Sequence, residues 1–243
     1  MSKPRILMLD IETAPAVAYV WQLWDVNSIG LDQLVAPGRT ICASWQWLGS
    51  SKVEFGAEWD AEGKDVFLRR LHEDMSKADA IITYNGDKFD LPKLNGEFIQ
   101  LGLAPPAPSA SIDLRTTVKK LGFTSGKLAH VGPLLRVGSK VKHEGFSLWA
   151  DVLKGEPRAQ AKMERYNKQD TRLLGKLYKR LLPYIKNHPY LHDTPPTSCP
   201  SCGSNKTQHR GVRRTKSFSI ERIQCQGCGS WFDGKRTKMG GNK

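Results

Sequence analysis

Two acidic side chains near the start of the chain, Asp10 and Glu12, have the spacing of a metal-binding pair. They directly follow residues 5–9, a nearly continuous apolar run that is typical of a buried central strand. Alternate residues of a strand point to one face, so both carboxylates are expected on the same face at the end of this strand. A divalent cation would account for two like charges placed side by side. In the alternative, one acid is a cap and the other lies on the surface.

Tyr166 and Asp170 form a second candidate pair. Residues 158–174 contain no Gly or Pro and carry a broken apolar face, which predicts a helix. Four residues separate the phenol from the carboxylate, so the two lie one turn apart on the same side of the helix. Such pairs are common in helices without any catalytic role. This pair becomes significant because two acidic clusters precede it in the chain.

The third candidate cluster is the stretch Asn85-Gly86-Asp87-Lys88-Phe89-Asp90, which follows a predicted buried strand at residues 78–84. Asp87 and Asp90 both fall in the first turn of the helix expected next, and either carboxylate could bind a cation. Asp113 lies between a short predicted strand and another helix, and it is interpreted as a helix cap rather than a metal ligand.

The order of the predicted elements indicates an α/β fold with a mixed sheet of about five strands, flanked by helices. Strands are expected at residues 5–9, 39–48, 51–56, 78–84 and 111–114. Helices are expected at 64–75, 88–101, 127–137, 147–153 and 158–182, and another helix follows the strand at 111–114 and ends at 121. Residues 14–38 are expected to form a loop with one helical turn. This domain is assigned to residues 1–190. A Pro-containing linker at 191–197 then leads to a small unit at 198–243.

The small C-terminal unit contains two C-x-x-C-G motifs, formed by Cys199 and Cys202 and, after 22 intervening residues, by Cys225 and Cys228. The Gly after each pair allows the tight turn that directs both thiolates toward one ion. Four thiolates at this spacing are typical of a closed tetrahedral zinc site, in a zinc ribbon that the metal would fold. A redox dithiol is the alternative. The fifth cysteine, Cys42, lies in a predicted strand and is expected to be buried.

The positive charge of the chain is concentrated in this C-terminal unit. Residues 1–193 hold 27 Lys and Arg against 22 Asp and Glu, whereas residues 194–243 hold 10 against 2. A basic unit beside an acidic cluster favours a polyanionic partner, most commonly nucleic acid. Basic side chains interleaved with aromatic ones suit nucleic-acid binding, and the candidates here are Arg210, Arg213, Arg214, Lys216, Phe218, Arg222 and Trp231. For the aromatic residues the alternative is packing around the zinc, and for the ribbon as a whole it is binding of a protein partner.

A second basic segment lies within the larger domain, in the glycine- and lysine-rich stretch from 122 to 145. Its cationic candidates for contact with a nucleic-acid backbone are Lys127, Arg136, Lys140, Lys142 and His143. Composition alone leaves open whether these residues bind phosphates or form a solvated surface.

The three acidic clusters together resemble the three motifs of the DEDD 3′→5′ exonucleases in order, separation and expected context. The matching motifs are Asp10-Ile11-Glu12-Thr13, Asn85-x-x-x-Phe89-Asp90 and Tyr166-x-x-x-Asp170. The chain has Arg165 where the histidine variant of the family has His, so the resemblance is to the tyrosine variant. It covers about residues 5–182 and is similar to the proofreading domains of family B DNA polymerases and to the predicted exonucleases of the YprB-like group. The family has a ribonuclease H-like fold.

This resemblance implies a two-metal-ion hydrolysis of phosphodiester bonds. It implies that two Mg²⁺ or Mn²⁺ ions are bound by four carboxylates, which are those of Asp10, Glu12, Asp90 and Asp170. It also implies that Tyr166 orients the attacking water, that Glu12 contacts the terminal 3′-hydroxyl, and that Thr13 and Asn85 position the ligands. Asp87 competes with Asp90 for its role, and the Phe89-Asp90 pairing favours Asp90.

The resulting hypothesis is a metal-dependent exonuclease that shortens single-stranded nucleic acid from its 3′ end, with DNA slightly favoured over RNA. A catalytically inactive nucleic-acid-binding protein and a structure-specific endonuclease on the same fold are the alternatives. A polymerase or another replication or repair protein is a possible partner in trans. No signal peptide or membrane-spanning run is recognisable, so a cytoplasmic, reducing setting is expected, in a bacterium or a phage-infected cell.

Overall fold

The computed structural model describes residues 4–186, 188–191 and 197–239. Most of the predicted linker at 191–197 lies outside the described residues. The elements follow in the order β1 (Ile6–Ala14), β2 (Val17–Ala18), a 3₁₀ turn (Leu31–Gln33), β3 (Leu34–Ala36), β4 (Arg39–Trp47), β5 (Glu54–Ala57), α1 (Gly63–Ser76), β6 (Ala80–Thr83), α2 (Asp90–Gln100), β7 (Ala110–Asp113), α3 (Leu114–Lys119), α4 (Leu128–Leu134), α5 (Phe146–Leu153), α6 (Pro157–Leu181), a second 3₁₀ turn (Leu182–Tyr184), β8 (Thr207–Arg214), β9 (Phe218–Cys225) and β10 (Trp231–Lys238).

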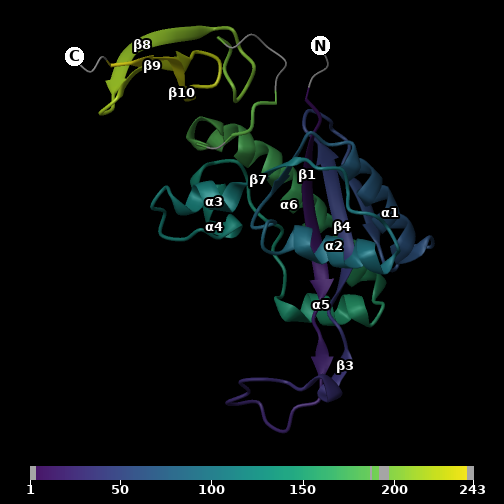
Figure 1. The fold of residues 1–243 in the computed structure, drawn as a ribbon. Helices are drawn as coiled ribbons and strands as arrows, with labels where there is room; N and C mark the ends of the chain where they lie inside the picture. The colour runs from purple at the N-terminus through teal and green to yellow at the C-terminus, as the bar shows by residue number, and fades with distance from the viewer. Residues whose placement is uncertain (1–3, 187, 192–196, 240–243) are drawn as a thin grey trace.

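The central layer is a five-stranded mixed sheet in the order β5-β4-β1-β6-β7, which confirms the predicted sheet. Strand β1 pairs antiparallel with β4 along nearly its whole length, and parallel with β6 over Ile6 to Met8 alone. The β6–β7 pair is also parallel. Figure 1 shows β1 and β4 running through the middle of the domain, with the helices on either side of them.

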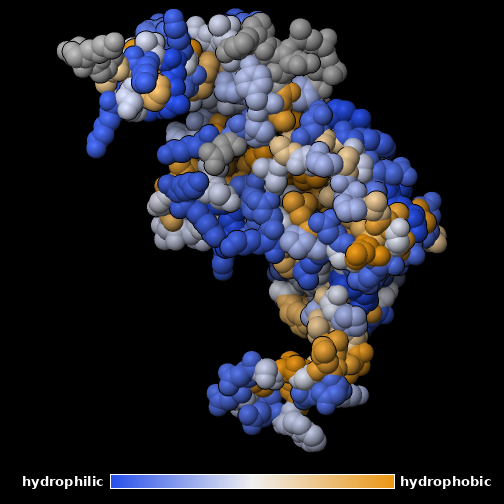
Figure 2. Space-filling model, viewed as in Figure 1, coloured by the Kyte–Doolittle hydropathy of each residue, from blue (hydrophilic) through white to orange (hydrophobic). Residues whose placement is uncertain are grey.

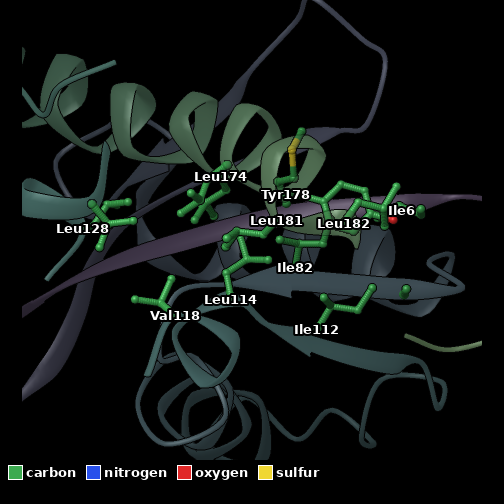
Figure 3. Packing of buried hydrophobic residues seen from close by; sticks show 14 residues of the cluster. Ile6, Ile82, Ile112, Leu114, Val118, Leu128, Leu174, Tyr178, Leu181 and Leu182 are labelled. Atoms are coloured by element: carbon green, nitrogen blue, oxygen red, sulfur yellow. The ribbon is translucent and has the colours of Figure 1, made fainter. Parts of the chain in front are cut away.

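Alternation along β1 divides the core into two layers. Leu7, Leu9 and Ile11 pack with buried residues of α1 and α2 on one face of the sheet. Ile6 and Met8 belong to the other layer, which is formed with α3, α4 and α6. Figure 3 shows side chains of α6 lying over the strands in this second layer. The same alternation therefore turns the next even-numbered residues of β1 toward α6.

Strand β1 is longer than predicted, since it extends to Ala14 rather than ending at Leu9. The expectation that Asp10 and Glu12 lie at the strand end was wrong. Both acids lie inside β1, opposite Ser44 and Cys42 of β4, and a bulge follows between Glu12 and Thr13. The polar residues did not end the strand because β4 supplies hydrogen-bond partners along it.

Other boundaries also differ from prediction. The stretch predicted as a loop contains the short strands β2 and β3 in addition to the expected 3₁₀ turn, and it projects from one end of the domain with Trp21 and Trp24 exposed. Helix α2 begins at Asp90, so Asp87 lies before the helix rather than in its first turn. Helix α4 ends at Leu134, three residues before the predicted end, and the chain then follows α6 as a loop.

The C-terminal unit is a three-stranded antiparallel sheet in the order β10-β9-β8, at the end of the domain opposite the projecting hairpin (Figure 1). It contacts the larger domain just after α6. The Ser230 hydroxyl donates a hydrogen bond of 3.4 Å to the carbonyl of Leu182, and Cys202 and Cys228 pack against the core layer under α6. Among the helices that the structure describes, none is long and apolar enough to cross a bilayer.

Candidate active site

The acidic side chains of β1 face helix α6 across a short distance, and a glycine sets that distance. A Cβ atom added to Gly175 would lie 2.6 Å from the sulfur of Met8, so only a glycine lets α6 approach β1 this closely. Asp170 lies five residues earlier on the same helix and is 2% exposed. The close packing therefore holds Asp170 over the part of β1 that carries Asp10 and Glu12.

One carboxylate oxygen from each of Asp10, Glu12 and Asp170 lies within 4.8 Å of the others. Oδ1 of Asp170 is buried without a hydrogen-bond partner. Carboxylate oxygens at this separation are the ligand set that Mg²⁺ and Mn²⁺ prefer, and a cation would satisfy the unpartnered oxygen. These residues therefore fit a divalent cation, and the structure brings together three of the four acids predicted to bind one.

Asp90, the fourth predicted acid, lies beside this group at the start of α2. Its Oδ1 accepts a hydrogen bond of 3.1 Å from the backbone amide of Ile11. That amide is available because β1 pairs with β6 only as far as Met8. Asp90 is 5% exposed, and burial raises its pKa to about 6, although the amide of Ile11 lowers it.

Burial raises the pKa of each acid in the cluster, and repulsion between the acids adds to this for Asp10 and Glu12. Burial is the largest cause for Asp10, whose pKa lies well above its ordinary value, and Asp170 and Glu12 add repulsion. The pKa of Glu12 rises to about 8, through burial and then the charge of Asp170. Burial also raises the pKa of Asp170, against the effect of Lys140. The cluster thus favours protons or cations over free negative charge.

Tyr166 lies one turn before Asp170 on α6 and is 5% exposed. Burial raises the pKa of its phenol further above the ordinary value near 10, and the charges of Glu12 and Asp170 add to this effect. The ring packs edge-on against His143, with centroids 5.0 Å apart, and against Trp149 at 5.9 Å. The hydroxyl is thus a neutral donor and acceptor held in a fixed place beside the acids.

Asn167 is a residue of the site that sequence reasoning missed. It is fully buried, and its Nδ2 donates hydrogen bonds of 2.7 Å to Oδ2 of Asp10 and 3.2 Å to the Asp10 carbonyl. The hydroxyl of Ser44 in β4 donates to the backbone carbonyl of Asn167 at 2.9 Å and lies 2.6 Å from the hydroxyl of Thr171. The helical spacing between Asn167 and Asp170 was the only available signal in the sequence.

Lys140 was predicted as a backbone contact, and the structure places it at the acids. Its ammonium lies 2.7 Å from Oδ2 of Asp170 and 4.7 Å from the centroid of the Tyr166 ring. Burial opposes the charge on Lys140, but Asp170 and Tyr166 outweigh it and raise the pKa of this ammonium. Lys140 is thus the cation that partly neutralises the cluster in the described structure.

Asn85, one of the two residues predicted to position the ligands, forms its hydrogen bonds elsewhere. Oδ1 of Asn85 accepts a hydrogen bond of 2.6 Å from the Arg115 guanidinium, and the Asn85 backbone amide donates to Asp113 at 2.8 Å, with Asn85 at a positive φ of 76°. Asp113 also accepts a hydrogen bond from the Arg115 amide, which confirms the predicted cap of α3. The two predicted roles in ligand positioning remain predictions. Thr13 lies directly after the bulge of β1.

Asp87, the rival of Asp90, lies outside the acid cluster. Its carboxylate accepts a hydrogen bond from the Ser111 hydroxyl at the edge strand β7. The preference for Asp90 over Asp87 remains a prediction, and it is supported by the contact of Asp90 with the backbone amide of Ile11, between Asp10 and Glu12 on β1.

The four cysteines of the C-terminal unit converge on one point. The Sγ atoms of Cys199 and Cys228 lie 3.7 Å apart, and those of Cys202 and Cys225 lie 3.6 Å apart. A tetrahedral zinc site with Zn–S bonds of about 2.3 Å has sulfur atoms about 3.8 Å apart, whereas a disulfide brings them to about 2 Å. The cluster is therefore consistent with a zinc ribbon. The fifth cysteine, Cys42, is fully buried in β4, as predicted.

Local backbone geometry supports this arrangement of thiols. Gly203 and Gly229 have φ angles of 70° and 83°, which confirms the expected tight turns after each pair. Burial raises the pKa of the Cys202 thiol, whereas the pKa of Cys225 falls to about 7. For Cys225, burial is outweighed by hydrogen bonds to its sulfur, among them those from the backbone amides of Gly227 and Cys228 at 3.2 and 3.4 Å.

The basic and aromatic candidates of the C-terminal unit are spread over its three strands and the β8–β9 turn. Arg210, Arg213 and Arg214 lie on β8, Lys216 in the turn, Phe218 and Arg222 on β9, and Trp231 on β10. Arg213 forms an ion pair of 2.6 Å with Asp233, and Arg222 lies 5.7 Å from the Trp231 ring. Their role in binding nucleic acid remains a prediction.

Comparison with known proteins supplies the family. The model of the RNase H superfamily matches residues 8–182, which include all three acidic clusters. The chain belongs to the RNase H superfamily. Its mixed five-stranded sheet with flanking helices is the RNase H-like fold, and the family supports nuclease activity and metal binding. No match was found among curated proteins.

Solved structures show the same fold. One similar structure is the family B DNA polymerase from the hyperthermophilic archaeon Pyrobaculum calidifontis, with a TM-score of 0.54 and 18% identity. The similarity covers 75% of this chain and 25% of the polymerase, so this RNase H superfamily member spans about a quarter of that protein's length.

Proposed function

We propose that this protein is a two-metal-ion 3′→5′ exonuclease that hydrolyses phosphodiester bonds at the 3′ end of single-stranded nucleic acid. The observation that carries the proposal is the convergence of Asp10, Glu12 and Asp170 within 4.8 Å, beside Tyr166. Membership in a nuclease superfamily and a fold shared with a DNA polymerase support it. Residues 1–190 would form the catalytic domain, and residues 198–243 a zinc ribbon.

Mg²⁺ or Mn²⁺ ions are the proposed catalytic cofactors, held by Asp10, Glu12, Asp90 and Asp170. Such ions lower the pKa of an attacking water and stabilise the leaving 3′-oxygen. The buried position and unpartnered oxygen of Asp170, and the hydrogen bond from Ile11 to Asp90, support a ligand set that is organised before the ions bind. One Zn²⁺ is proposed for the four cysteines.

The side chains around the acids would orient the reactants. Tyr166, neutral because its pKa is raised, would hold the attacking water by hydrogen bonding rather than remove its proton. Asn167 fixes the carboxylate of Asp10 from α6. Lys140, which pairs with Asp170, would provide positive charge close to the scissile phosphate.

The test uses single-stranded DNA and RNA of one sequence, labelled at the 5′ end, with Mg²⁺, with Mn²⁺ and with EDTA. A metal-dependent ladder that shortens from the 3′ end is expected, with DNA the faster substrate. Asp170→Ala should abolish the ladder while the strand still binds. The matched control is Glu164→Ala, which removes an acid of the same helix whose side chain is 41% exposed.

The other outcomes correspond to the alternatives. Strands that bind but stay intact would indicate an inactive binding protein, and discrete internal cuts would indicate an endonuclease. Hydrolysis that survives in Asp170→Ala would contradict the proposed ligand set. A replication or repair protein that binds in trans, and a cytoplasmic location, belong to the same proposal.

A further inference from the structure

A shallow groove of about 490 Å³ lies between the loop after α4 and the C-terminal half of α6. It is lined by Leu135, Arg136, Val137, Lys176, Lys179 and Arg180. Four of these six residues are cations, and no acid lines the groove. In the described part of the chain, none of the four cations forms an ion pair with Asp or Glu. The groove therefore concentrates positive charge that the protein itself does not neutralise.

The sequence around the groove is strongly segregated in charge. Residues 114–143 contain seven Lys and Arg and no Asp or Glu, and residues 171–186 contain five and none. The rest of residues 1–193 holds more acids than bases. Figure 2 shows hydrophilic surface gathered over α3 and α4, where the first of these segments lies. Two separate acid-free segments thus meet at one place on a catalytic domain whose overall charge is only slightly positive.

Interaction with the dipole of α6 explains only some of the groove cations. Lys179 and Arg180 lie in the last turn of α6, where cations interact favourably with the helix dipole. Arg136, however, belongs to another segment and has a left-handed φ of 57°, immediately after the C-cap of α4. Gly is the usual residue there, and an L side chain costs about 1–2 kcal/mol. An arginine at this position needs a further reason, and a ligand supplies one.

Two contacts between one loop and α6 connect the groove to the acid cluster. After Arg136 the loop runs alongside α6, where the Ser139 carbonyl accepts a hydrogen bond of 3.1 Å from Gln169. The next residue, Lys140, reaches Asp170 at 2.7 Å. One short loop therefore carries both the groove cation and the cation at the acids.

The spacing along α6 suits a chain of phosphates. Lys176 and Arg180 follow Asp170 by six and ten residues, which corresponds to about 9 and 15 Å along a helix. A nucleic-acid strand advances roughly 3.4 Å per stacked nucleotide, so these distances span about three to four nucleotides. Phosphates spaced along a strand would reach the groove cations while the strand's end lies at the acids.

We propose that this groove binds the backbone phosphates of the substrate strand, about three to four nucleotides from the bond that is cleaved. The inference rests on the proposed exonuclease function and adds a binding site to it. Because phosphates carry no base identity, the groove would contribute affinity for longer strands without sequence preference.

The test compares the wild type with a groove variant, Arg136→Gly/Lys176→Gln/Arg180→Gln. Binding of fluorescein-labelled oligothymidylate of 12 nucleotides is measured against salt, without added divalent cation. Three lost phosphate contacts should reduce the slope of log Kd against log salt by about 2, and weaken binding about tenfold or more near 0.1 M salt. A charge-matched control, Lys52→Gln/Arg69→Gln/Lys77→Gln, should change the slope by less than half as much.

A cleavage assay with two substrates distinguishes the role of the groove from that of the catalytic site. Thymidine 5′-(p-nitrophenyl phosphate) contains one phosphodiester and cannot reach the groove, so the groove variant should cleave it at the wild-type rate with Mn²⁺. The same variant should cleave subsaturating oligothymidylate about tenfold more slowly. Equal losses on both substrates, or an unchanged salt slope, would overturn the proposal.

The single variant Arg136→Gly is the control for correct folding. It removes the strain of an L side chain in the left-handed conformation, so it should keep or raise the melting temperature. The results also distinguish failure of the groove proposal from failure of the exonuclease proposal. If the wild type cleaves neither substrate but the salt slope still falls in the groove variant, the phosphate site stands and the exonuclease does not. If the wild type cleaves both and the slope is unchanged, the groove proposal fails alone.

Discussion

Replacing Glu12 by glutamine should stabilise the protein at pH 9 in the absence of Mg²⁺ and Mn²⁺, and change its stability little at pH 5. The reason is the folded-state pKa of Glu12, which burial and the charge of Asp170 raise from 4.5 to about 8. Below pH 4.5 the side chain is neutral in both the folded and the unfolded protein. As the pH rises from 4.5 to 8, ionisation favours the unfolded chain, so stability is lost over this range and stays low above it.

The magnitude follows from the two pKa values. At about 1.36 kcal/mol per pKa unit, the ionised Glu12 lowers the free energy of unfolding by up to about 5 kcal/mol above pH 8. Glu12 keeps some exposure to water, which weakens this penalty. We therefore expect Glu12→Gln to gain about 2–4 kcal/mol at pH 9, and less than about 1 kcal/mol at pH 5.

The assay is urea unfolding of both proteins at pH 5 and pH 9, without added divalent cation and without a chelator, so that the Zn²⁺ proposed for the cysteine cluster is not removed. The control variant is Glu73→Gln on α1, where the side chain is 68% exposed and a change within about 0.5 kcal/mol is expected at either pH. Added Mg²⁺ should stabilise the wild type more than Glu12→Gln, because cation binding favours the folded state. Equal effects of Glu12→Gln at both pH values, or a loss of stability at pH 9, would refute the electrostatic argument.

Three further substitutions test the neighbouring residues. Tyr166→Phe keeps the ring contact with His143 and removes the hydroxyl. The hydrolysis rate should fall about 10- to 100-fold, while calorimetry should show unchanged Mn²⁺ affinity. A wild-type rate would exclude the water-orienting role. Asn167→Ala releases the carboxylate of Asp10 and should weaken Mn²⁺ binding about tenfold, and unaltered affinity would count against this hydrogen bond as a positioning contact. Cys202→Ser removes one of four thiolates, so mass spectrometry should find less than the one Zn²⁺ per chain expected for the wild type. Limited proteolysis should also cleave the C-terminal sheet faster. Full zinc retention would argue against the four-thiolate site.

Local patterns predicted much of this site correctly. Strand alternation placed Asp10 and Glu12 on one face, and helical spacing placed Tyr166 one turn from Asp170. The two C-x-x-C-G motifs predicted the converging thiols in the same way. Each of these patterns extends over a few residues of one element, where the backbone geometry fixes the relative direction of side chains.

Elements that depend on distant partners were predicted less well. The sequence of β1 becomes polar after Leu9, which suggested that the strand ends there, but pairing with β4 extends it to Ala14. The two strands of the projecting hairpin are two and three residues long and carry no clear alternation. Short strands of this kind are stabilised by the partner strand rather than by their own composition.

The sequence by itself determined the carboxylates, the phenol and the thiols, because these groups are defined by residue type and by spacing within single elements. Only the tertiary structure decided which groups surround them. Lys140 reaches Asp170 across 30 residues, Asn167 reaches Asp10 across 157, and the Ile11 amide reaches Asp90 across 79. Such contacts depend on how the helices pack on the sheet, and periodicity along the chain carries no information about that packing.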